Sequence, residues 1–176
     1  IHSNICVDAE LISSVVSADA SYTREPGVVC AVLTADCLPI FVSNKKGTVV
    51  GVAHAGWKGL VGGVIESLLT SFGLDKNDLV AHLGPAISQI SFEVGEEVKS
   101  QYLSKNINFE SCFTELNEKY YLDLYSAARV VLKSCGITSI TGGDRCTYDE
   151  PDQYFSYRRD GAKSGRMAHL IWIKPD

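Results

Sequence analysis

The sequence predicts an α+β fold in which helices pack on a mixed β-sheet. Runs of β-branched and apolar residues at 28–34, 38–43 and 48–54 follow one another with only short turns between them. Their nearly continuous apolar character is typical of a sheet that is covered on both faces. The helical segments come later and do not alternate strictly with strands, which disfavours a doubly wound fold.

In the first half of the chain, turn chemistry and apolar spacing set the expected elements. The sequence "NKKG" at 44–47 is typical of a hairpin turn, so the strands on either side of it should be neighbours. Apolar residues then recur at helical spacing over 58–72, and Gly73 is a natural residue to end that helix. A short strand is expected at 79–83, before Gly84-Pro85.

The second half contains further helices and strands. Helices are expected at 92–103 and 123–136, and strands near 137–141 and 168–173. In the helix at 123–136, Asp123 is the expected N-cap and Gly136 the expected terminator. Residues 104–122 are polar and irregular, with room for a short strand.

Length and composition limit the class of protein. A chain of 176 residues with 45% hydrophobic and 21% charged residues is typical of one globular domain. The net charge of −5 gives no basic footprint for nucleic acid or an anionic membrane, and no apolar run or signal-peptide pattern is evident. Six cysteines without a CxxC pair, two of them in apolar surroundings (Cys30 and Cys135), favour a reducing, cytoplasmic setting over a disulfide-linked secreted one.

Two residues at strand ends carry the most distinctive chemistry. Cys37 stands at a bend between two expected strands, and His54 follows it by 17 residues at the end of the next strand. If those strands are neighbours, the thiol and the imidazole meet at one sheet edge. They then suit either a Cys–His nucleophile pair or a zinc site with His2 as third ligand. A buried cysteine with hydrogen-bonded histidines is the simpler alternative.

Residues around this pair are candidates for substrate contact or proton transfer. Glycines crowd the start of the helix that follows His54, at Gly56, Gly59, Gly62 and Gly63. Together with Lys58, they either leave a helix N-terminus open to an anion such as phosphate or only allow close packing on the sheet. Asp36, beside Cys37, is a candidate general acid or base, or else it caps a turn.

The segment "FSYRRDG" at 155–161 supplies candidate anion-binding and stacking groups. Read as a strand, it places Arg158 and Arg159 on opposite faces, so at most one of them faces a site. Phe155 and Tyr157 are candidates for stacking on a base, although core packing is the commoner use of aromatic residues. Cys146 lies in a loop, His82 is expected to be a core or edge histidine, and no partner for His169 is evident.

Taken in order, several segments resemble the laccase-domain family, whose members are also labelled polyphenol-oxidase-like or peptidoglycan editing factor. The segments are "IHSN", "ADASYT", "TADCLPIF", "VAHAGWKGL", "GPAIS", "FEVG", "CT" and "FSYRRDG". The resemblance implies one laccase-like domain over 1–176 that lacks an N-terminal segment of the full-length protein. It also implies an α+β fold similar to the catalytic domain of cytotoxic necrotising factors.

The resemblance further implies a function and a set of residues. The function is zinc-dependent phosphorolysis of purine nucleosides (adenosine, inosine, methylthioadenosine), with adenosine deaminase as a second activity, in a monomer or weak dimer. The implied metal ligands are His2, Cys37 and His54, the catalytic residues Cys37, His54 and Asp36, and the substrate-binding residues Arg158, Gly56 and Lys58. Copper is the alternative metal, but four histidines are too few for several copper centres. The alternative enzymes are a metal-free Cys–His hydrolase acting on an amide or a peptidoglycan precursor and a copper-dependent phenol oxidase. A binding module whose metal is structural is the non-enzymatic alternative.

Overall fold

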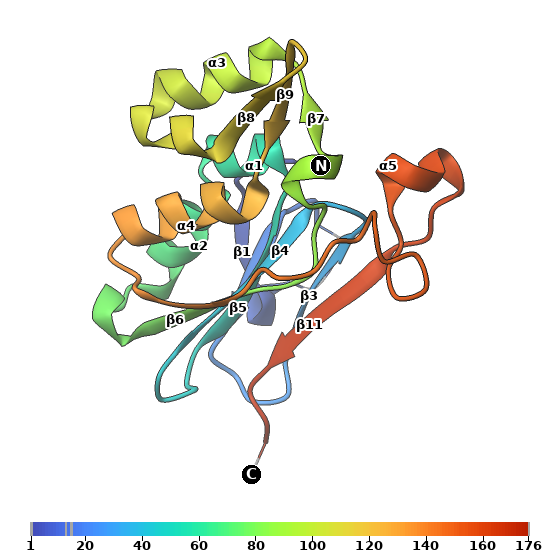
Figure 1. Cartoon of the computed structure of the whole chain (residues 1–176). Helices are drawn as coiled ribbons and strands as arrows, with labels where there is room; N and C mark the ends of the chain where they lie inside the picture. The colour runs from blue at the N-terminus through green and yellow to red at the C-terminus, as the bar shows by residue number, and fades with distance from the viewer. Residues whose placement is uncertain (1, 13, 15, 176) are drawn as a thin grey trace.

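A six-stranded mixed sheet forms the centre of the computed structural model, which describes residues 2–12, 14 and 16–175 (Figure 1). The strands lie in the order β1 (Cys6–Asp8), β2 (Ala20–Thr23), β5 (Val50–Ala55), β4 (Leu38–Asn44), β6 (Leu79–Leu83) and β10 (Ser139–Gly142). The outer pairs β1–β2 and β6–β10 are parallel, and the pairs between them are antiparallel. The central strands β4 and β5 are almost entirely buried, as their continuous apolar sequences predict.

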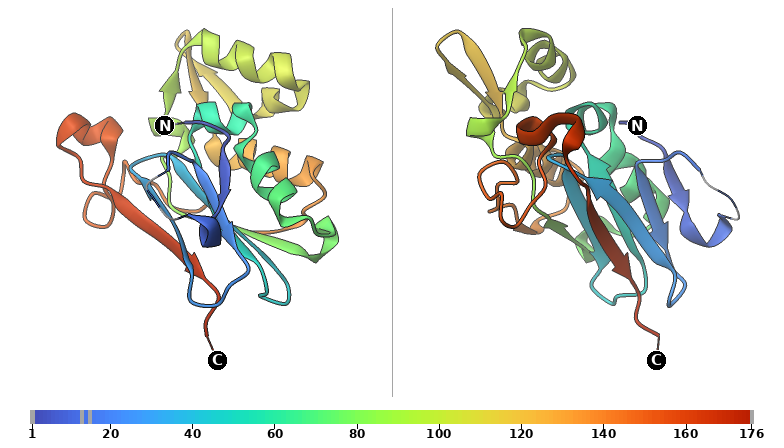
Figure 2. Two further views of the ribbon diagram at one scale, coloured as in Figure 1. Left: turned by 180° about the vertical axis from the view of Figure 1, so that it is seen from behind. Right: turned by 90° about the vertical axis from the view of Figure 1, so that its right-hand side faces the viewer.

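Helices cover one face of this sheet and bury the larger hydrophobic core against it (Figures 1 and 2). They are α1 (Trp57–Gly62), α2 (Val64–Phe72) and α4 (Leu124–Ser134). Ile65, Leu68 and Phe72 of α2 recur at helical spacing and are at most 1% exposed. This is the arrangement expected of an amphipathic helix packed on a sheet.

A second, two-stranded antiparallel sheet covers part of the other face (Figure 2). It pairs β3 (Val29–Thr34) with β11 (Met167–Trp172). Side chains of β3 alternate, so that Cys30 and Val32 pack against Val52 of the large sheet while Leu33 stays exposed. At one end of this small sheet, Thr34 at the end of β3 pairs with Met167 at the start of β11.

The remaining elements sit above the helical layer and beside the ends of the strands (Figure 1). They are a three-stranded sheet of β7 (Glu93–Val94), β9 (Lys119–Leu122) and β8 (Phe113–Leu116), with α3 (Glu96–Lys105) and the short α5 (Tyr157–Asp160). Short 3₁₀ helices lie at Ala9–Leu11, Lys76–Asp78, Gln89–Ser91, Ile107–Cys112 and Gly161–Lys163. Buried Tyr102 of α3 donates a hydrogen bond to the carbonyl of Trp57 at 2.8 Å, which ties this layer to α1.

The predicted fold class and most of the predicted elements are confirmed. The strands expected at 38–43 and 79–83 match β4 and β6, and the hairpin turn lies between β4 and β5. Asp123 caps α4 by accepting a hydrogen bond from the amide of Ser126, as expected. Strands β1 and β2 were not predicted, because each is short and only partly apolar.

Two predicted helices are wrong in part. The helix expected at 58–72 is broken at Gly63, whose φ of 93° ends α1 and starts α2. The Lys105 ammonium accommodates the break by donating to the carbonyl of Val61 at 2.7 Å. The helix expected at 92–103 begins only at Glu96, because the two preceding strand residues pair with β9 instead.

The region expected to be irregular, 104–122, contains the hairpin β8–β9. Its turn places Asn117 and Glu118 at φ of 52° and 61°, the positive values that a type I′ hairpin turn requires. Because Glu118 is not a residue that favours such a conformation, the sequence carried only a weak signal for this turn.

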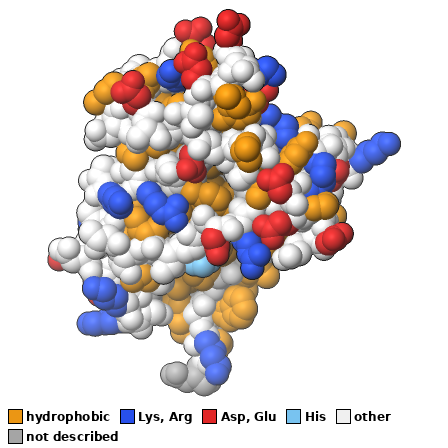
Figure 3. All heavy atoms as spheres, viewed as in Figure 1, with side chains coloured by type: hydrophobic (Ala, Val, Ile, Leu, Met, Phe, Trp, Pro, Cys, Tyr) orange, Lys and Arg blue, Asp and Glu red, His pale blue; other side chains and the backbone are white. Residues whose placement is uncertain are grey.

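Charge distribution, hydropathy and the cysteines complete the description of the fold. Acidic and basic side chains are interspersed over the face shown in Figure 3. Within the described residues, no helix combines the length and the hydropathy needed to cross a bilayer. All six cysteines are free, and Cys30 is buried as expected while Cys135 is only partly buried.

Candidate metal centre

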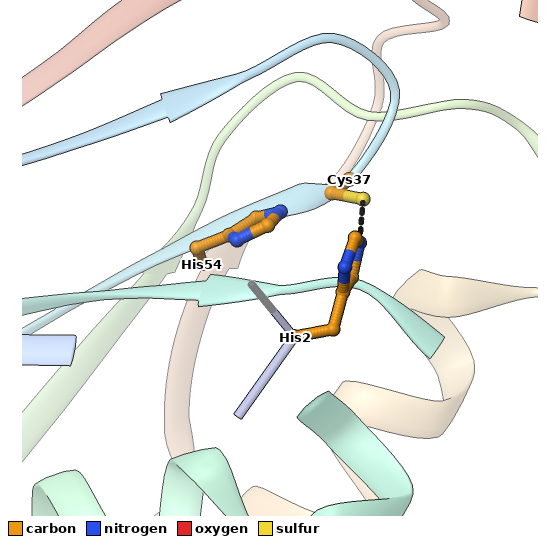
Figure 4. Close-up of side chains that lie close together, drawn as sticks. All are labelled: His2, Cys37 and His54. Carbon is orange, nitrogen blue, oxygen red and sulfur yellow. Dashed lines mark hydrogen bonds between the residues drawn. The ribbon is translucent and has the colours of Figure 1, made fainter. Parts of the chain in front are cut away.

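Three side chains from separate segments meet at one end of the central strands β4 and β5 (Figure 4). Cys37 directly precedes β4 and His54 is the penultimate residue of β5, and the antiparallel pairing of these strands brings the two residues together. His2 comes from the segment before β1. Its Nε2 lies 3.7 Å from Cys37 Sγ, and ligand atoms of all three residues lie within 4.8 Å of one another. The structure therefore brings together the three ligands expected from the sequence.

A buried carboxylate holds His54 in place. Asp19, just before β2, is 2% exposed, and its Oδ1 lies 2.8 Å from His54 Nδ1. Burial alone raises the pKa of Asp19, but hydrogen bonds from His54 and Ser3 outweigh it and leave this pKa well below its ordinary value. The ionised carboxylate can only accept, so His54 Nδ1–H donates to it, and in the neutral form of the ring Nε2 keeps its lone pair.

The electrostatics of the other two residues favour metal ligation over nucleophilic attack. Burial, with the neighbouring His54, lowers the pKa of His2, and this favours the neutral imidazole that binds metals. Burial, with Asp36 and Asp19, raises the pKa of the Cys37 thiol to about 12. An activated nucleophilic thiol needs a lowered pKa, whereas a bound metal deprotonates a coordinating thiol outright.

Gly56 allows the three side chains to approach one another. A Cβ built on Gly56 would lie 2.8 Å from Cys37 Sγ and 2.8 Å from His2 Cδ2, which is closer than real contacts allow. Its φ of −69° is open to any residue, so the requirement for glycine is steric and not conformational.

Asp36 joins the thiol to another part of the site. Its φ of 88° is rare outside glycine, and its side chain is 8% exposed. Its carboxylate accepts from Thr147 Oγ1 at 2.7 Å and from the backbone N–H of Arg158 at 2.6 Å. Both oxygens therefore hold the chain around the site, and the acid–base role expected of Asp36 stays a prediction.

The three candidate ligands form part of the wall of a cavity of about 450 Å³. This volume falls in the range of about 300–1,000 Å³ that is typical of small-molecule sites. Aromatic and cationic side chains form much of the rest of the wall: Trp57, Phe92, Tyr157, Arg158 and Arg166. The other lining residues are Leu33, Thr34, Ala35, Asp36, Ile87 and Leu124.

The two arginines of the cavity wall are held against aromatic rings. The Arg158 guanidinium lies 5.3 Å from the centre of the Phe92 ring and donates to the carbonyl of Glu93 at 3.0 Å. The Arg166 guanidinium lies 5.5 Å from the centre of the Tyr157 ring. Cation–π contacts of this kind orient a guanidinium while leaving donors free for an anion.

The expectation that Arg158 and Arg159 lie on a strand is wrong. Ser156 accepts a hydrogen bond from the amide of Arg159 and caps the short helix α5. The alternating aromatic residues of this segment had suggested a strand instead. Arg159 turns away from the cavity and donates to the carbonyls of Thr147 and Tyr148, each at 2.9 Å. One arginine of the pair lines the cavity, as expected, but for a reason other than strand alternation.

Other sequence candidates lie at the margin or elsewhere. Lys58 lies with its ammonium 5.4 Å from the centre of the Trp57 ring and is absent from the described cavity wall. Phe155 packs near Gly165, and Cys146 contacts Ser88 Oγ at 3.0 Å. The remaining histidines have hydroxyl partners: buried His169 bonds to Thr34 at 2.8 Å, and exposed His82 to Thr141 at 2.9 Å.

Sequence reasoning missed Asp19 and Arg166. Asp19 lies within "ADASYT", but its pairing with His54 depends on strand β2, which was not predicted. Arg166 directly precedes β11, whose first residue pairs with Thr34 at the end of β3. Reasoning from strand ends, as applied to Cys37 and His54, would have placed Arg166 near the same end of the strands.

Comparison with known proteins now identifies the chain. Residues 1–174 match the model of the family described as multi-copper polyphenol oxidoreductase laccase. The chain belongs to this family. The resemblance found in the sequence is therefore confirmed, while the single domain expected over 1–176 stays a prediction.

Relatives in the family include proteins named purine nucleoside phosphorylase. The chain is 47% identical over 156 residues to YfiH of Escherichia coli (strain K12), which covers 89% of this chain and 64% of the relative. It is 39% identical over 176 residues to PA4543 of Pseudomonas aeruginosa, which covers 99% of this chain and 72% of the relative. The chain thus spans a little under two thirds of the E. coli relative.

Solved structures of similar proteins have the same fold. The chain superimposes on Neisseria meningitidis protein NMB0706 with a TM-score of 0.96 at 43% identity, over 99% of this chain and 73% of that one. It superimposes on YlmD of Geobacillus stearothermophilus with a TM-score of 0.89 at 30% identity, over 99% and 72% of the two chains.

The residues present fit a zinc ion better than the several coppers in the family's description. Two imidazoles and a thiol that line a cavity on one side suit a catalytic zinc with one open position. Among residues 2–12, 14 and 16–175, this is the one group of His, Cys, Asp and Glu with metal-binding spacing. Several coppers need more ligands than this group offers.

Proposed function

We propose that this protein is a zinc-dependent purine nucleoside phosphorylase acting on adenosine, inosine and methylthioadenosine. The observation that carries the proposal is that the His2–Cys37–His54 group opens on a cavity whose wall also bears aromatic rings and guanidinium groups. These are the groups that a purine and a phosphate need. The names of the E. coli and P. aeruginosa relatives support the same activity.

The roles of the chain's own residues follow from their placement. In phosphorolysis, a phosphate oxygen bonds to C1′ of the ribose while the bond from C1′ to the purine nitrogen breaks. Arg158 and Arg166 are the proposed phosphate-binding residues, because guanidinium groups bind phosphate through paired N–H donors. Phe92 and Tyr157 are the proposed stacking surfaces for the purine. The substrates are thus bound and oriented for in-line attack.

His2, Cys37 and His54 are the proposed zinc ligands, and zinc held there would supply a Lewis acid in the wall of the cavity. In this proposal, Cys37 and His54 serve the reaction as ligands and not as a nucleophile and a base. Asp36 precedes Cys37 in the chain and accepts a hydrogen bond from the backbone N–H of Arg158, so it fixes these two residues relative to each other. Gly56 keeps the space between the ligands open. Lys58 at the margin adds positive charge near His2.

Adenosine deaminase activity is the second candidate, because an open zinc position in a purine-sized cavity also suits hydrolytic removal of an amino group. A Cys–His hydrolase of amides or peptidoglycan precursors has less support, because burial raises the pKa of Cys37 instead of lowering it. Copper-dependent phenol oxidation has less support because the candidate ligands form a single group among the described residues. Six free cysteines support the proposed cytoplasmic setting.

The experiment combines metal analysis with product analysis. Purified protein loaded with zinc is incubated with adenosine, with and without inorganic phosphate. Adenine and ribose 1-phosphate that appear only with phosphate would support phosphorolysis, and inosine formed without phosphate would support deamination. A fully zinc-loaded protein that produces neither contradicts the proposal.

A further inference from the structure

The Asp19 carboxylate contacts two of the three segments that supply candidate ligands. Its Oδ1 pairs with His54 Nδ1 at 2.8 Å, and its Oδ2 accepts a short hydrogen bond from the backbone N–H of Ser3, the residue after His2. The backbone carbonyl of Asp19 also accepts from the amide of His54 at 2.7 Å. Asp19 is therefore bonded both to His54 and to the segment that carries His2.

The contact with His54 decides which ring nitrogen is available to a ligand. A neutral imidazole carries one proton, and an ionised carboxylate beside Nδ1 keeps that proton on Nδ1. Nε2 then keeps its lone pair and takes the role of acceptor or metal ligand. An amide in place of the carboxylate would allow the opposite tautomer, because its NH₂ group donates to Nδ1 and moves the ring proton to Nε2.

The contact with Ser3 bears on the position of the His2 imidazole. His2 has a φ of 62°, a conformation that residues other than glycine seldom adopt. Such a conformation persists where neighbouring contacts hold it. The hydrogen bond from Ser3 to buried Asp19 is one such contact, since Ser3 is bonded covalently to His2.

We propose that Asp19 is a positioning residue for the candidate metal centre, one that selects the Nδ1–H tautomer of His54 and fixes the backbone that carries His2. The inference rests on the ligand set proposed above, although its tautomer component concerns the protein without metal. Asp19 touches neither substrate nor metal in this assignment and acts through the two imidazoles. Outer carboxylates of this kind change metal affinity by about 10- to 100-fold when they are removed.

The test measures the tautomer and the zinc affinity separately. Metal-free protein labelled with ¹⁵N-histidine is studied by long-range ¹H–¹⁵N correlation NMR, and the His54 signals are assigned with a His54→Gln variant. The expected pattern is a protonated Nδ1 and an unprotonated Nε2 in the wild type. Zinc affinity is then measured by competition with a chromophoric chelator for the wild type, Asp19→Asn and Asp8→Asn.

Asp8→Asn is the matched control, since it makes the same carboxylate-to-amide change at a residue that caps the turn at Glu10 and is not part of the candidate metal group. We expect Asp19→Asn to lose the single tautomer and to bind zinc about 10- to 100-fold more weakly, with Asp8→Asn unchanged. A neutral wild-type His54 ring that carries its proton on Nε2 overturns the inference, as does an Asp19→Asn variant with wild-type zinc affinity. If Asp19→Asn does not fold, the wild-type tautomer still decides.

These outcomes separate the inference from the proposed function. A wild-type protein that binds no zinc contradicts the zinc proposal, and the tautomer measurement then still tests the action of Asp19 on His54. A wild type that binds zinc but lacks phosphorolysis contradicts the proposed activity and leaves the affinity comparison intact.

Discussion

Substituting alanine for Gly56 tests the geometry of the metal centre most directly. The added Cβ would lie 2.8 Å from both Cys37 Sγ and His2 Cδ2, and ordinary contact begins at 3.4 Å. Each side chain must therefore retreat by about 0.6 Å, three times the tolerance of about 0.2 Å for zinc–ligand distances. We expect zinc affinity to fall by at least about tenfold, which is about 1.4 kcal/mol.

Metal-free Gly56→Ala should remain folded, because its φ of −69° accepts alanine and the two crowded side chains can move apart when no metal holds them. Crowding costs about 1–3 kcal/mol in a packed site, partly offset by about 0.4–1 kcal/mol from the stiffer unfolded chain. Zinc affinity is measured by chelator competition, and stability by urea unfolding of the metal-free protein.

The matched control for this substitution is Gly62→Ala at the end of α1, where a Cβ would meet nothing within 4 Å. It should leave zinc affinity unchanged. A Gly56→Ala protein that binds zinc as tightly as the wild type would refute the reasoning, because the close packing of Cys37 and His2 would then not be the arrangement that holds the metal.

Three further changes test other parts of the site and fold. Cys37→Ala should abolish zinc binding and activity together, and retained zinc would show that the ligand assignment is wrong. Arg166→Ala should raise the KM for phosphate by about 10- to 100-fold, since charged hydrogen bonds contribute about 1.5–3 kcal/mol, while Arg145→Ala outside the cavity should not. Burial lowers the pKa of His169, so the unfolded chain binds a proton first as pH falls below about 6.5 and the free energy of unfolding decreases. His169→Gln should make that decrease smaller in urea titrations at about pH 7.5 and 5.5, and an unchanged decrease would contradict this.

The parts of the site that depend on local signals were predictable from the sequence. The turn residues at 44–47 made β4 and β5 neighbours, and this pairing alone brings Cys37 beside His54. The position of His2 was different, since the sequence offered it only as a candidate third ligand before a short apolar stretch, and the family resemblance strengthened that choice. The segment that carries His2 is fixed by hydrogen bonds to residues far along the chain, and composition does not encode such contacts.

The segments that were predicted wrongly have sequences compatible with two local conformations. The alternating aromatic residues of "FSYRRDG" suggest a strand, but the Ser156 side chain caps a helix and Asp36 holds the Arg158 amide. Similarly, a glycine at 63 is compatible with a continuous helix or a break, and the αL conformation is stabilised by a lysine more than forty residues away in sequence, Lys105. In both cases, contacts with residues distant in sequence determine which local conformation forms.

Asp36 connects the candidate metal ligand Cys37 on one side of the cavity with Arg158 on the other. A covalent bond joins it to the candidate thiol ligand, and a 2.6 Å hydrogen bond joins it to the backbone of Arg158. Asp36 is thus bonded to both sides of the cavity. By thermodynamic reciprocity, any factor by which an anion at Arg158 changes metal affinity is the same factor by which the metal changes anion affinity. Wherever such a factor differs from one, a dissociation constant measured for one ligand of this protein has meaning only at a stated concentration of the other.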